Sequence, residues 1–233
     1  MGHLGWQLRR LSYLAGRGEL SLSFIAAKAR ERFWSDRRYI VLRRDLSRPF
    51  EHPKAPVAFS IHPYEPGNAA SLFDPDSPED RAERWKAESW MERGLKRCYV
   101  AVLLDGRATF IQWVCTPSDR KALRVIFGGT LPDVEPGTVL LEGAYTPPRF
   151  RRLPIMPAAM ARIAEEGRPL GARWALVSVD EDNASMLRAA QWAGFTPWRL
   201  TSVRHRMFRR LVTRADLPVG PELARFVWTG FPA

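Results

Sequence analysis

The sequence predicts an α+β or α/β domain in which helices cover the faces of one sheet. Three observations predict this class. Two N-terminal stretches have apolar residues at helical spacing, a hairpin signal stands near the middle of the chain, and strand and helix patterns alternate in the second half. A chain of 233 residues has room for one large domain, or for one domain with an appendage.

The chain is strongly basic, with 36 Lys and Arg against 25 Asp and Glu and a formal net charge of +11. This excess favours acidic partners such as phosphate-bearing cofactors, nucleic acids or anionic membrane surfaces. Nucleic acid is a minor expectation, because no nucleic-acid-binding motif is recognisable. The sequence has no apolar run of ~18 residues, as a membrane-spanning helix needs, and no signal-peptide pattern. With only Cys98 and Cys115, it predicts a cytoplasmic protein with ordinary buried thiols.

Residues 1–50 hold eleven basic and four acidic residues, a net of +7, and are predicted to form a basic helical extension with a short strand. Helical spacing predicts helices at about 3–15 and 19–34, and Tyr39–Leu42 predicts the strand. We favour a helical cap packed on the sheet with a solvated basic face. The alternative is contact with anionic lipid or a charged substrate carrier. The main domain is predicted to span residues 51–233.

Local signals predict the next elements. Val57–Ile61 is a credible strand inside a proline-rich stretch. Ser77 offers a helix cap, and the proline and two acids that follow it predict a helix at about 78–94. The pair Asp105-Gly106 stands between two apolar runs and predicts a β-hairpin. The two runs are Tyr99–Leu104 and Ala108–Val114.

The second half alternates strand and helix patterns. In order, it predicts a strand at Val139–Tyr145, a helix at about 154–166, a strand at Trp174–Val179, a helix at about 183–192, a β-prone stretch at Trp198–Phe208 and a proline-rich tail. The connection after the first of these strands is rich in arginine. A strand that ends in a tight turn and restarts as a helix leaves amides unpaired at the positive end of the helix dipole, where a pyrophosphate fits.

Two segments of this half resemble the GCN5-related N-acetyltransferase (GNAT) superfamily. Thr146–Met156 reads Thr-Pro-Pro-Arg-Phe-Arg-Arg-Leu-Pro-Ile-Met and is similar to the family's turn between its fourth strand and the following helix. Asn183 precedes Gly194-Phe195 at the family's spacing. The resemblance covers about 57–208. It implies a mixed, mainly antiparallel central sheet with two splayed parallel strands and flanking helices.

The resemblance also implies an acyl-CoA-dependent N-acyltransferase, which moves an acetyl group from acetyl-CoA, or another acyl group from its acyl-CoA, to an amine. The residues it implies for cofactor binding are Thr146, Arg151, Arg152, Leu153, Pro154, Ile155, Met156 and Asn183. The chain departs from the family where Pro154 and Met156 replace glycine or a small residue. It departs again at Ala190, where many members carry a tyrosine that protonates the leaving thiolate.

Two residues of the strand Val139–Tyr145 are candidate catalytic groups. Amine acylation needs a proton acceptor, and several family members place a base in this strand, which makes Glu142 the candidate. The alternative interpretation, which the sequence supports equally, is that the Glu142 side chain points to solvent from a strand of alternating polarity. Tyr145 is a thiolate donor, a substrate contact or, as we favour, a core ring. No histidine has a partner at metal-ligand spacing, so no metal is expected.

Two functions follow from these observations. The first is an acyltransferase that acts on a small-molecule amine or a charged acceptor. The second is a binding or scaffold module with the same fold, in which Pro154, Met156 and Ala190 mark the decay of the catalytic machinery. Such a module would sit at a membrane surface through residues 1–50.

Overall fold

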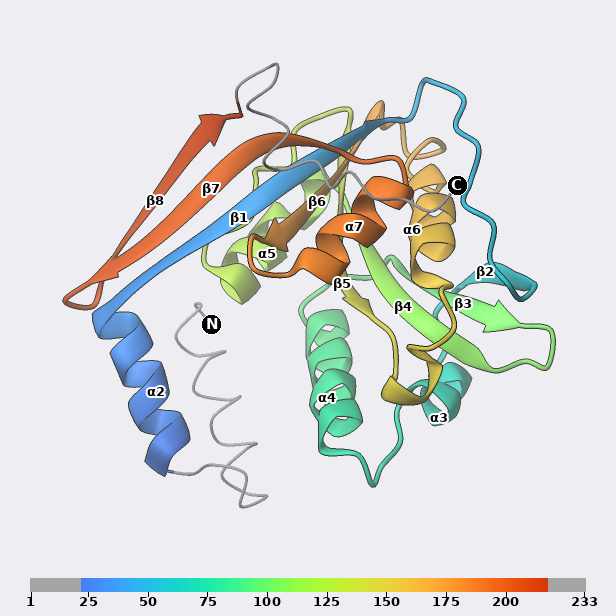
Figure 1. Ribbon diagram of the computed structural model, residues 1–233, viewed down its shortest axis with the longest axis horizontal. Coiled ribbons are helices and arrows are strands. Elements are labelled where there is room, and N and C mark those ends of the chain that lie inside the picture. Colours follow the sequence, from blue (N-terminus) through green and yellow to red (C-terminus); the bar gives the residue numbers. More distant parts are fainter. Residues whose placement is uncertain (1–21, 218–233) are drawn as a thin grey trace.

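The computed structural model describes residues 22–217, in which strands and helices alternate along the chain (Figure 1). In chain order the elements are α2 (Leu22–Phe33), β1 (Trp34–Asp45), β2 (Phe59–Pro63), α3 (Ala69–Leu72), α4 (Pro78–Glu92), β3 (Cys98–Leu103), β4 (Ala108–Cys115), α5 (Arg120–Phe127), β5 (Thr138–Tyr145), α6 (Met156–Glu165), β6 (Trp174–Asp180), α7 (Ala184–Trp192), β7 (Thr196–Arg206) and β8 (Arg209–Asp216). The predicted helix at about 3–15 lies outside the described residues.

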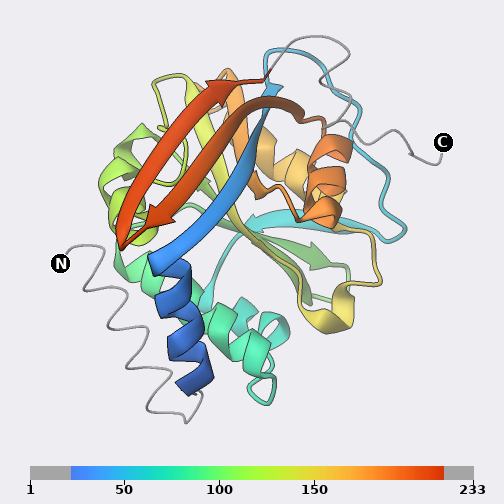
Figure 2. The ribbon, with the colours of Figure 1, turned by 60° about the vertical axis from the view of Figure 1, so that its left-hand side comes forward.

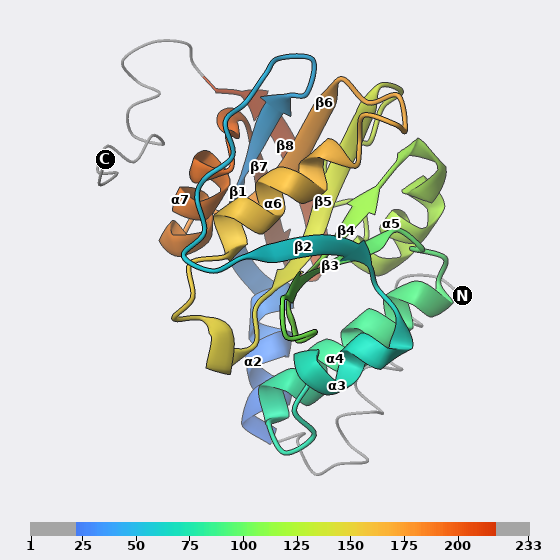
Figure 3. The ribbon, with the colours of Figure 1, turned by 90° about the vertical axis from the view of Figure 1, so that its right-hand side faces the viewer.

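The eight strands form one sheet in the order β2-β3-β4-β5-β6-β1-β7-β8. Every neighbouring pair is antiparallel except β5 and β6, which are parallel. The mixed, mainly antiparallel sheet with flanking helices is therefore confirmed. Its twist carries β1, β7 and β8 into a long curved ribbon (Figure 2). Helix α6 lies across the face of the sheet, above β2 in the view of Figure 3.

An apolar core lies on each face of the sheet, because successive side chains of a strand point to opposite faces. On one face, Met160 of α6 and Leu187 of α7 belong to the buried cluster. On the other, Trp90 of α4 and Leu123 of α5 pack with the strand residue Trp113 in a second cluster. The two helix pairs thus hold the middle of the sheet from both sides, where β5 and β6 lie.

The structure corrects the predicted organisation of the first fifty residues. The strand predicted at Tyr39–Leu42 is real but runs from Trp34 to Asp45, and it lies inside the sheet between β6 and β7. Residues 34–45 are therefore part of the main sheet rather than of a separate extension. The sequence hides the start of this strand because residues 34–38 extend past the end of β6 and are mostly exposed and polar. The second predicted helix is confirmed as α2.

Most other predicted elements are confirmed, including the hairpin of β3 and β4 and the helix capped by Ser77, whose hydroxyl accepts a hydrogen bond from the Asp80 amide. Helix α5 and strand β8 were not predicted from the sequence. Strand β8 lies at an edge of the sheet and is almost entirely exposed, so it has no apolar alternation to reveal it.

The two cysteines are buried free thiols, as predicted. Burial raises the pKa of both Cys98 and Cys115 well above the ordinary value, which keeps them protonated and unreactive. Between residues 22 and 217, no helix combines the length and the apolarity needed to cross a bilayer.

Candidate active site

The two parallel strands separate towards their carboxyl ends. Residues 138–141 of β5 pair with residues 174–177 of β6, and no pairing between the two strands continues beyond Leu141 and Val177. Strand β5 nevertheless runs on to Tyr145 and β6 to Asp180. The splay that the family resemblance implies is therefore present.

A β-bulge in β5 accompanies the separation. Trp113 of β4 pairs with Glu142 and Ile111 pairs with Tyr145, so that Gln112 alone faces the two residues Gly143 and Ala144. An extra residue of this kind bends the strand and increases its twist. The bulge therefore turns the end of β5 away from its parallel neighbour.

Gly143 is the residue that allows the bulge. Its φ is +67°, a left-handed conformation that favours glycine. A Cβ at this position would stand 2.4 Å from Cζ3 of Trp90 and 2.9 Å from Cε3 of Trp113. The two indoles meet edge to face with their centroids 5.0 Å apart. The bulge is thus held from the α4 side by a pair of aromatic rings that leaves no room for a side chain.

A cleft of about 690 Å³ lies beside the separated strands. It is bordered by the end of β5, the turn that follows, the start of α6 and one side of α7. Among the predicted cofactor-binding residues, those that line it are Thr146, Arg151, Leu153, Pro154, Met156 and Asn183. Ile155 is buried in the core beneath α6, with 2% of its surface exposed, and is therefore not placed to touch a ligand in the cleft. Met156 borders the cleft without filling it.

The turn between β5 and α6 uses part of its own hydrogen-bonding capacity. The amides of Leu153 and Ile155 donate to carbonyls within the turn, at 2.9 Å and 2.7 Å. Pro154, and Pro157 in the first turn of α6, have no N–H to offer. Among the described residues, the amides of Arg152, Met156 and Ala158 have no acceptor. The start of α6 therefore keeps a smaller set of free donors than a glycine-rich turn would.

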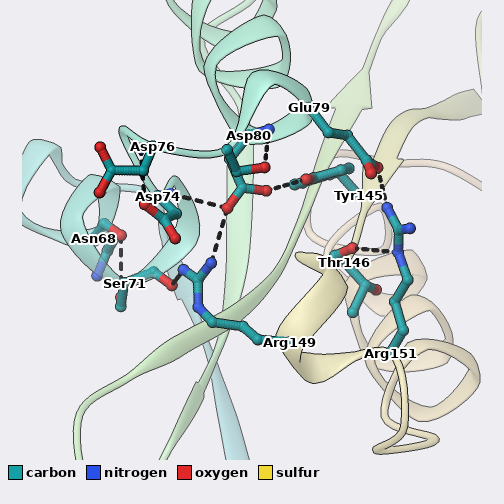
Figure 4. Close-up of polar contacts among 11 residues, drawn as sticks. Asn68, Ser71, Asp74, Asp76, Glu79, Asp80, Tyr145, Thr146, Arg149 and Arg151 are labelled. Atoms are coloured by element: carbon teal, nitrogen blue, oxygen red, sulfur yellow. Dashed lines mark hydrogen bonds and ion pairs between the residues drawn. The ribbon is translucent and has the colours of Figure 1, made fainter.

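The three arginines of this turn differ in their partners, and Figure 4 shows the contacts of Arg149 and Arg151. Arg149 donates to the buried carboxylate of Asp80 at 2.8 Å. Arg151 forms an ion pair with Glu79, and its Nε donates to the carbonyl of Thr146 at 3.1 Å. Arg152 is exposed and has no acidic partner within residues 22–217. Of the three, Arg151 borders the cleft, whereas Arg152 carries the unpaired charge and is not among the residues that line the cleft.

Asp80 joins α4 to the end of β5. From the sequence, this residue was only one of the two acids that signal the start of a helix. One of its oxygens accepts from the Tyr145 hydroxyl, and the other accepts from Arg149 and from the Asp74 amide. Burial opposes ionisation of Asp80, but these hydrogen bonds outweigh it and lower its pKa. Burial and the Asp80 carboxylate together raise the pKa of Tyr145.

Tyr145 is thus a buried ring whose hydroxyl donates to Asp80, and it also borders the cleft. No local pattern in the sequence reveals this contact, since the two residues are 65 positions apart. In the sequence, Asp80 stands out only as one of the two acids at the start of α4.

Glu142 lies on the same face of β5 as Tyr145, across from Trp113. Its Oε1 accepts a hydrogen bond of 3.2 Å from the Gly143 amide, while its Oε2 is buried and has no partner among the described residues. Burial raises its pKa from the ordinary 4.5 to about 7, although the Gly143 amide and the positive charge of Lys86 act in the opposite direction. The structure does not place this carboxylate as a freely solvated surface group.

Asn183 caps α7. Its Oδ1 accepts from the Met186 amide at 3.1 Å and from the Ser185 hydroxyl at 3.0 Å, and the residue borders the cleft. Seven residues later, Ala190 is fully buried in the core beneath α7. Its neighbour Ala189 lines the cleft, and neither residue offers a proton.

A second hollow, of about 1050 Å³, also borders Asn183 but has a different character. It is polar and is lined by charged residues of β1, β7 and the segment after β6. These charges are paired with one another, as in Arg38 with Glu181 at 2.6 Å and Arg204 with Asp36 at 3.5 Å. The arginines of this hollow are therefore already held by carboxylates. Within residues 22–217, no three His, Cys, Asp or Glu side chains gather as a metal site.

Solved structures with a similar fold include N-acetyltransferases. A GCN5-related glucosamine N-acetyltransferase region of a fungal multi-domain β-N-acetylglucosaminidase aligns with a TM-score of 0.51 at 14% identity, over 82% of this chain and 22% of that one. A GCN5-related N-acetyltransferase from Sphaerobacter thermophilus aligns with a TM-score of 0.48 at 18% identity, over 82% of this chain and 56% of that one. A GNAT-family acetyltransferase from Colwellia psychrerythraea aligns with a TM-score of 0.46 at 12% identity, over 84% of this chain and 62% of that one.

The first of these likenesses supports the fold. The chain has the mixed sheet of the acetyltransferases that the sequence resembles, and its fold is that of the GNAT superfamily. It spans less than two thirds of the length of the two bacterial proteins, 56% and 62% respectively. No protein-family model matches the sequence, and no curated protein matches it.

Proposed function

We propose that the chain is an acyl-CoA-dependent N-acyltransferase that transfers an acetyl or another acyl group to an amine. The observation that carries this proposal is the separation of β5 and β6, which leaves a cleft of about 690 Å³ at the amino end of α6. A helix start with unpaired amides attracts phosphate groups. A long ligand with a diphosphate at its middle fits the combination of cleft and helix start.

Several groups in and around the cleft fit such a ligand. The hydroxyl oxygen of Thr146 is buried at the cleft and has no hydrogen-bond partner in the described part of the chain. Gln112, which faces the bulge, is fully buried with both of its amide atoms unpartnered over the same range. Buried polar atoms without partners are costly, and a bound ligand would relieve that cost at Thr146. We propose that Thr146 and the free amides of Arg152, Met156 and Ala158 bind the cofactor, with the Arg152 guanidinium on a phosphate.

When bound, an acyl-CoA supplies a thioester. The amine nitrogen forms a bond to its carbonyl carbon, the carbon–sulfur bond breaks, and the thiolate leaves and takes up a proton. We propose that Glu142 accepts the proton that the amine loses, directly or through one water. A carboxylate with a pKa of about 7 suits this role, because a base is most effective near the working pH.

We propose that Tyr145 positions the end of β5 rather than donating a proton to the thiolate. Its hydroxyl already donates to Asp80, and its pKa is raised. With Ala190 buried, we propose that the thiolate takes its proton from water or from Glu142 after that carboxylate has accepted the proton of the amine. The acceptor amine is a small molecule or a charged group, consistent with the basic charge of the chain.

Calorimetric titration of the full chain with acetyl-CoA tests the cofactor proposal. We expect saturable binding, weakened roughly tenfold by Arg152→Ala, because one charge-assisted contact is lost. Arg209→Ala is the matched control, since it removes another exposed arginine that has no acidic partner in the described residues and that lies at the β7–β8 turn. Absence of binding to acetyl-CoA and to longer acyl-CoAs, or equal losses in both variants, contradicts the proposal.

The second candidate function is a binding module that holds acyl-CoA without turning it over. Pro154 and Pro157, which reduce the donors at the helix start, and the buried Ala190 favour it. Thiol release measured with a panel of amines separates the two candidates. Release that depends on the amine and is abolished by Glu142→Gln supports the enzyme, whereas binding without release supports the module.

A further inference from the structure

The turn between β7 and β8 has an unusual composition for its backbone. Arg206 pairs with Arg209, so the turn consists of Met207 and Phe208 alone. Both have positive φ, at 49° and 65°. Two-residue hairpin turns with two positive φ values strongly prefer Asn-Gly or Asp-Gly. Here two bulky apolar side chains stand at these positions and are 70% and 68% exposed.

Further apolar side chains surround the turn. Phe33, at the end of α2, meets the ring of Phe208 with centroids 5.7 Å apart, and its carbonyl accepts from the Met207 amide at 2.8 Å. Trp34, the first residue of β1, is 60% exposed, and Leu211 of β8 is 57% exposed. We refer to Phe33, Trp34, Met207, Phe208 and Leu211 as the apolar tip. Exposed apolar patches of this kind mark interaction sites.

Arginines surround the apolar tip. Arg206 lies over the Trp34 ring at 3.9 Å and also pairs with Asp36 at 2.7 Å. Arg32 and Arg209 are exposed and have no acidic partner within the described residues. Arg210 follows directly and donates to the carbonyl of Gly128. The surface around the tip therefore has a positive charge that this part of the chain does not neutralise.

The tip projects from the body of the sheet. Strand β1 pairs with β6 only from Tyr39 onwards, so its first five residues extend past the end of β6 with β7 and β8 beside them. At ~3.3 Å per residue, this overhang is roughly 17 Å long. Figures 1 and 2 show the ribbon of β1, β7 and β8 reaching outwards to this turn. The overhang lies at the end of the sheet towards which β5 and β6 separate.

We propose that the apolar tip docks on an anionic lipid bilayer. Its rings and the Met207 side chain would enter the boundary between headgroups and acyl chains, and the surrounding guanidiniums would contact lipid phosphates. Three observations favour this occupant: the apolar groups lie on a projecting turn, they occupy positions where the backbone disfavours them, and unpaired positive charge surrounds them. The proposal does not depend on acyl transfer.

Flotation of the full chain with vesicles tests it. Vesicles of phosphatidylcholine alone are compared with vesicles of phosphatidylcholine and phosphatidylglycerol, at low and high salt. The double variant Met207→Asn/Phe208→Gly removes the apolar groups and supplies the residues that the turn prefers, so the hairpin stays folded. We expect it to weaken binding to the anionic vesicles by roughly tenfold or more. Arg209→Glu is expected to weaken it by a similar factor and to reduce its salt dependence.

Leu104→Asn is the matched control. Leu104 is the most exposed of the large apolar residues, at 88%, but it lies on the β3–β4 turn away from the tip. We expect this variant to bind the anionic vesicles as the unchanged chain does. Equal binding by the double variant, equal binding to both kinds of vesicle, or self-association that the double variant abolishes without any vesicle binding would each overturn the proposal.

Discussion

The substitution Glu142→Gln should abolish the proposed acyl transfer, because it removes the base. It should also remove a loss of stability that the unchanged chain suffers as the pH rises. It keeps the size of the side chain and an oxygen that can accept from the Gly143 amide, and it removes the ionisable group. In the folded chain this carboxyl has a pKa of about 7 instead of 4.5. Between these two pH values the folded state binds more protons than the unfolded state, so the free energy of unfolding falls as the pH rises.

The size of the effect follows from the pKa shift. A displacement from 4.5 to about 7 corresponds to about 3 kcal/mol. The unchanged chain should therefore lose about 3 kcal/mol relative to Glu142→Gln as the pH rises from below 4.5 to above 7. An unpartnered Gln amide adds a cost of about 1–3 kcal/mol to the variant, but this cost does not vary with pH. The pH dependence of the difference is thus the quantity that reports on Glu142.

Urea denaturation of both chains over this pH range measures the difference. Glu88→Gln is the control, because it removes one negative charge from an exposed position on α4 where Glu88 pairs with Arg84. A difference between Glu142→Gln and the unchanged chain that stays constant from acid to alkaline pH would refute the burial argument. In the same range, acyl transfer by the unchanged chain should rise with pH through about 7, because the base must be deprotonated.

Three further substitutions test the residues that hold the elements around the cleft in place. For each, urea denaturation measures the stability and titration with acetyl-CoA measures the binding. Gly143→Ala should destabilise by about 3 kcal/mol or more, since its Cβ would meet the Trp90 ring at 2.4 Å. Asn183→Ala should cost about 1 kcal/mol through the lost cap of α7; an unchanged midpoint contradicts that role. Arg149→Ala should cost about 1–3 kcal/mol by leaving Asp80 short of a partner. That loss should fade as the pH falls and Asp80 is protonated; greater loss in acid contradicts the assignment.

The sequence predicted those elements whose signals are local. The Asp105-Gly106 turn and the Ser77 cap each act within a few residues, and both are present. The extent of β1 was not predictable in this way, because its polar first half is a strand only through its pairing with β7. Strand β8 has no apolar alternation because its side chains are exposed at an edge of the sheet.

The same distinction between local signals and distant contacts applies to the candidate site. The position of the turn after β5 was predictable, because a strand, a basic turn and a helix follow one another directly. The separate roles of its arginines were not. Arg149 and Arg151 bind acids of α4 that lie 69 and 72 positions earlier in the chain, and only the folded structure shows that they are occupied.

The departures from the family's turn have a physical consequence for how this chain would hold a diphosphate. A glycine-rich turn binds phosphate mainly through backbone amides, which lie in fixed positions. Here the prolines of the connection have no N–H, the amides of Phe150, Arg151, Leu153 and Ile155 are used within it, and two arginines are held by Asp80 and Glu79. The remaining charge is the exposed Arg152 side chain, which must be ordered on binding. Cofactor binding by this chain would therefore rest more on a mobile cation, and less on preorganised backbone donors, than the family's turn does.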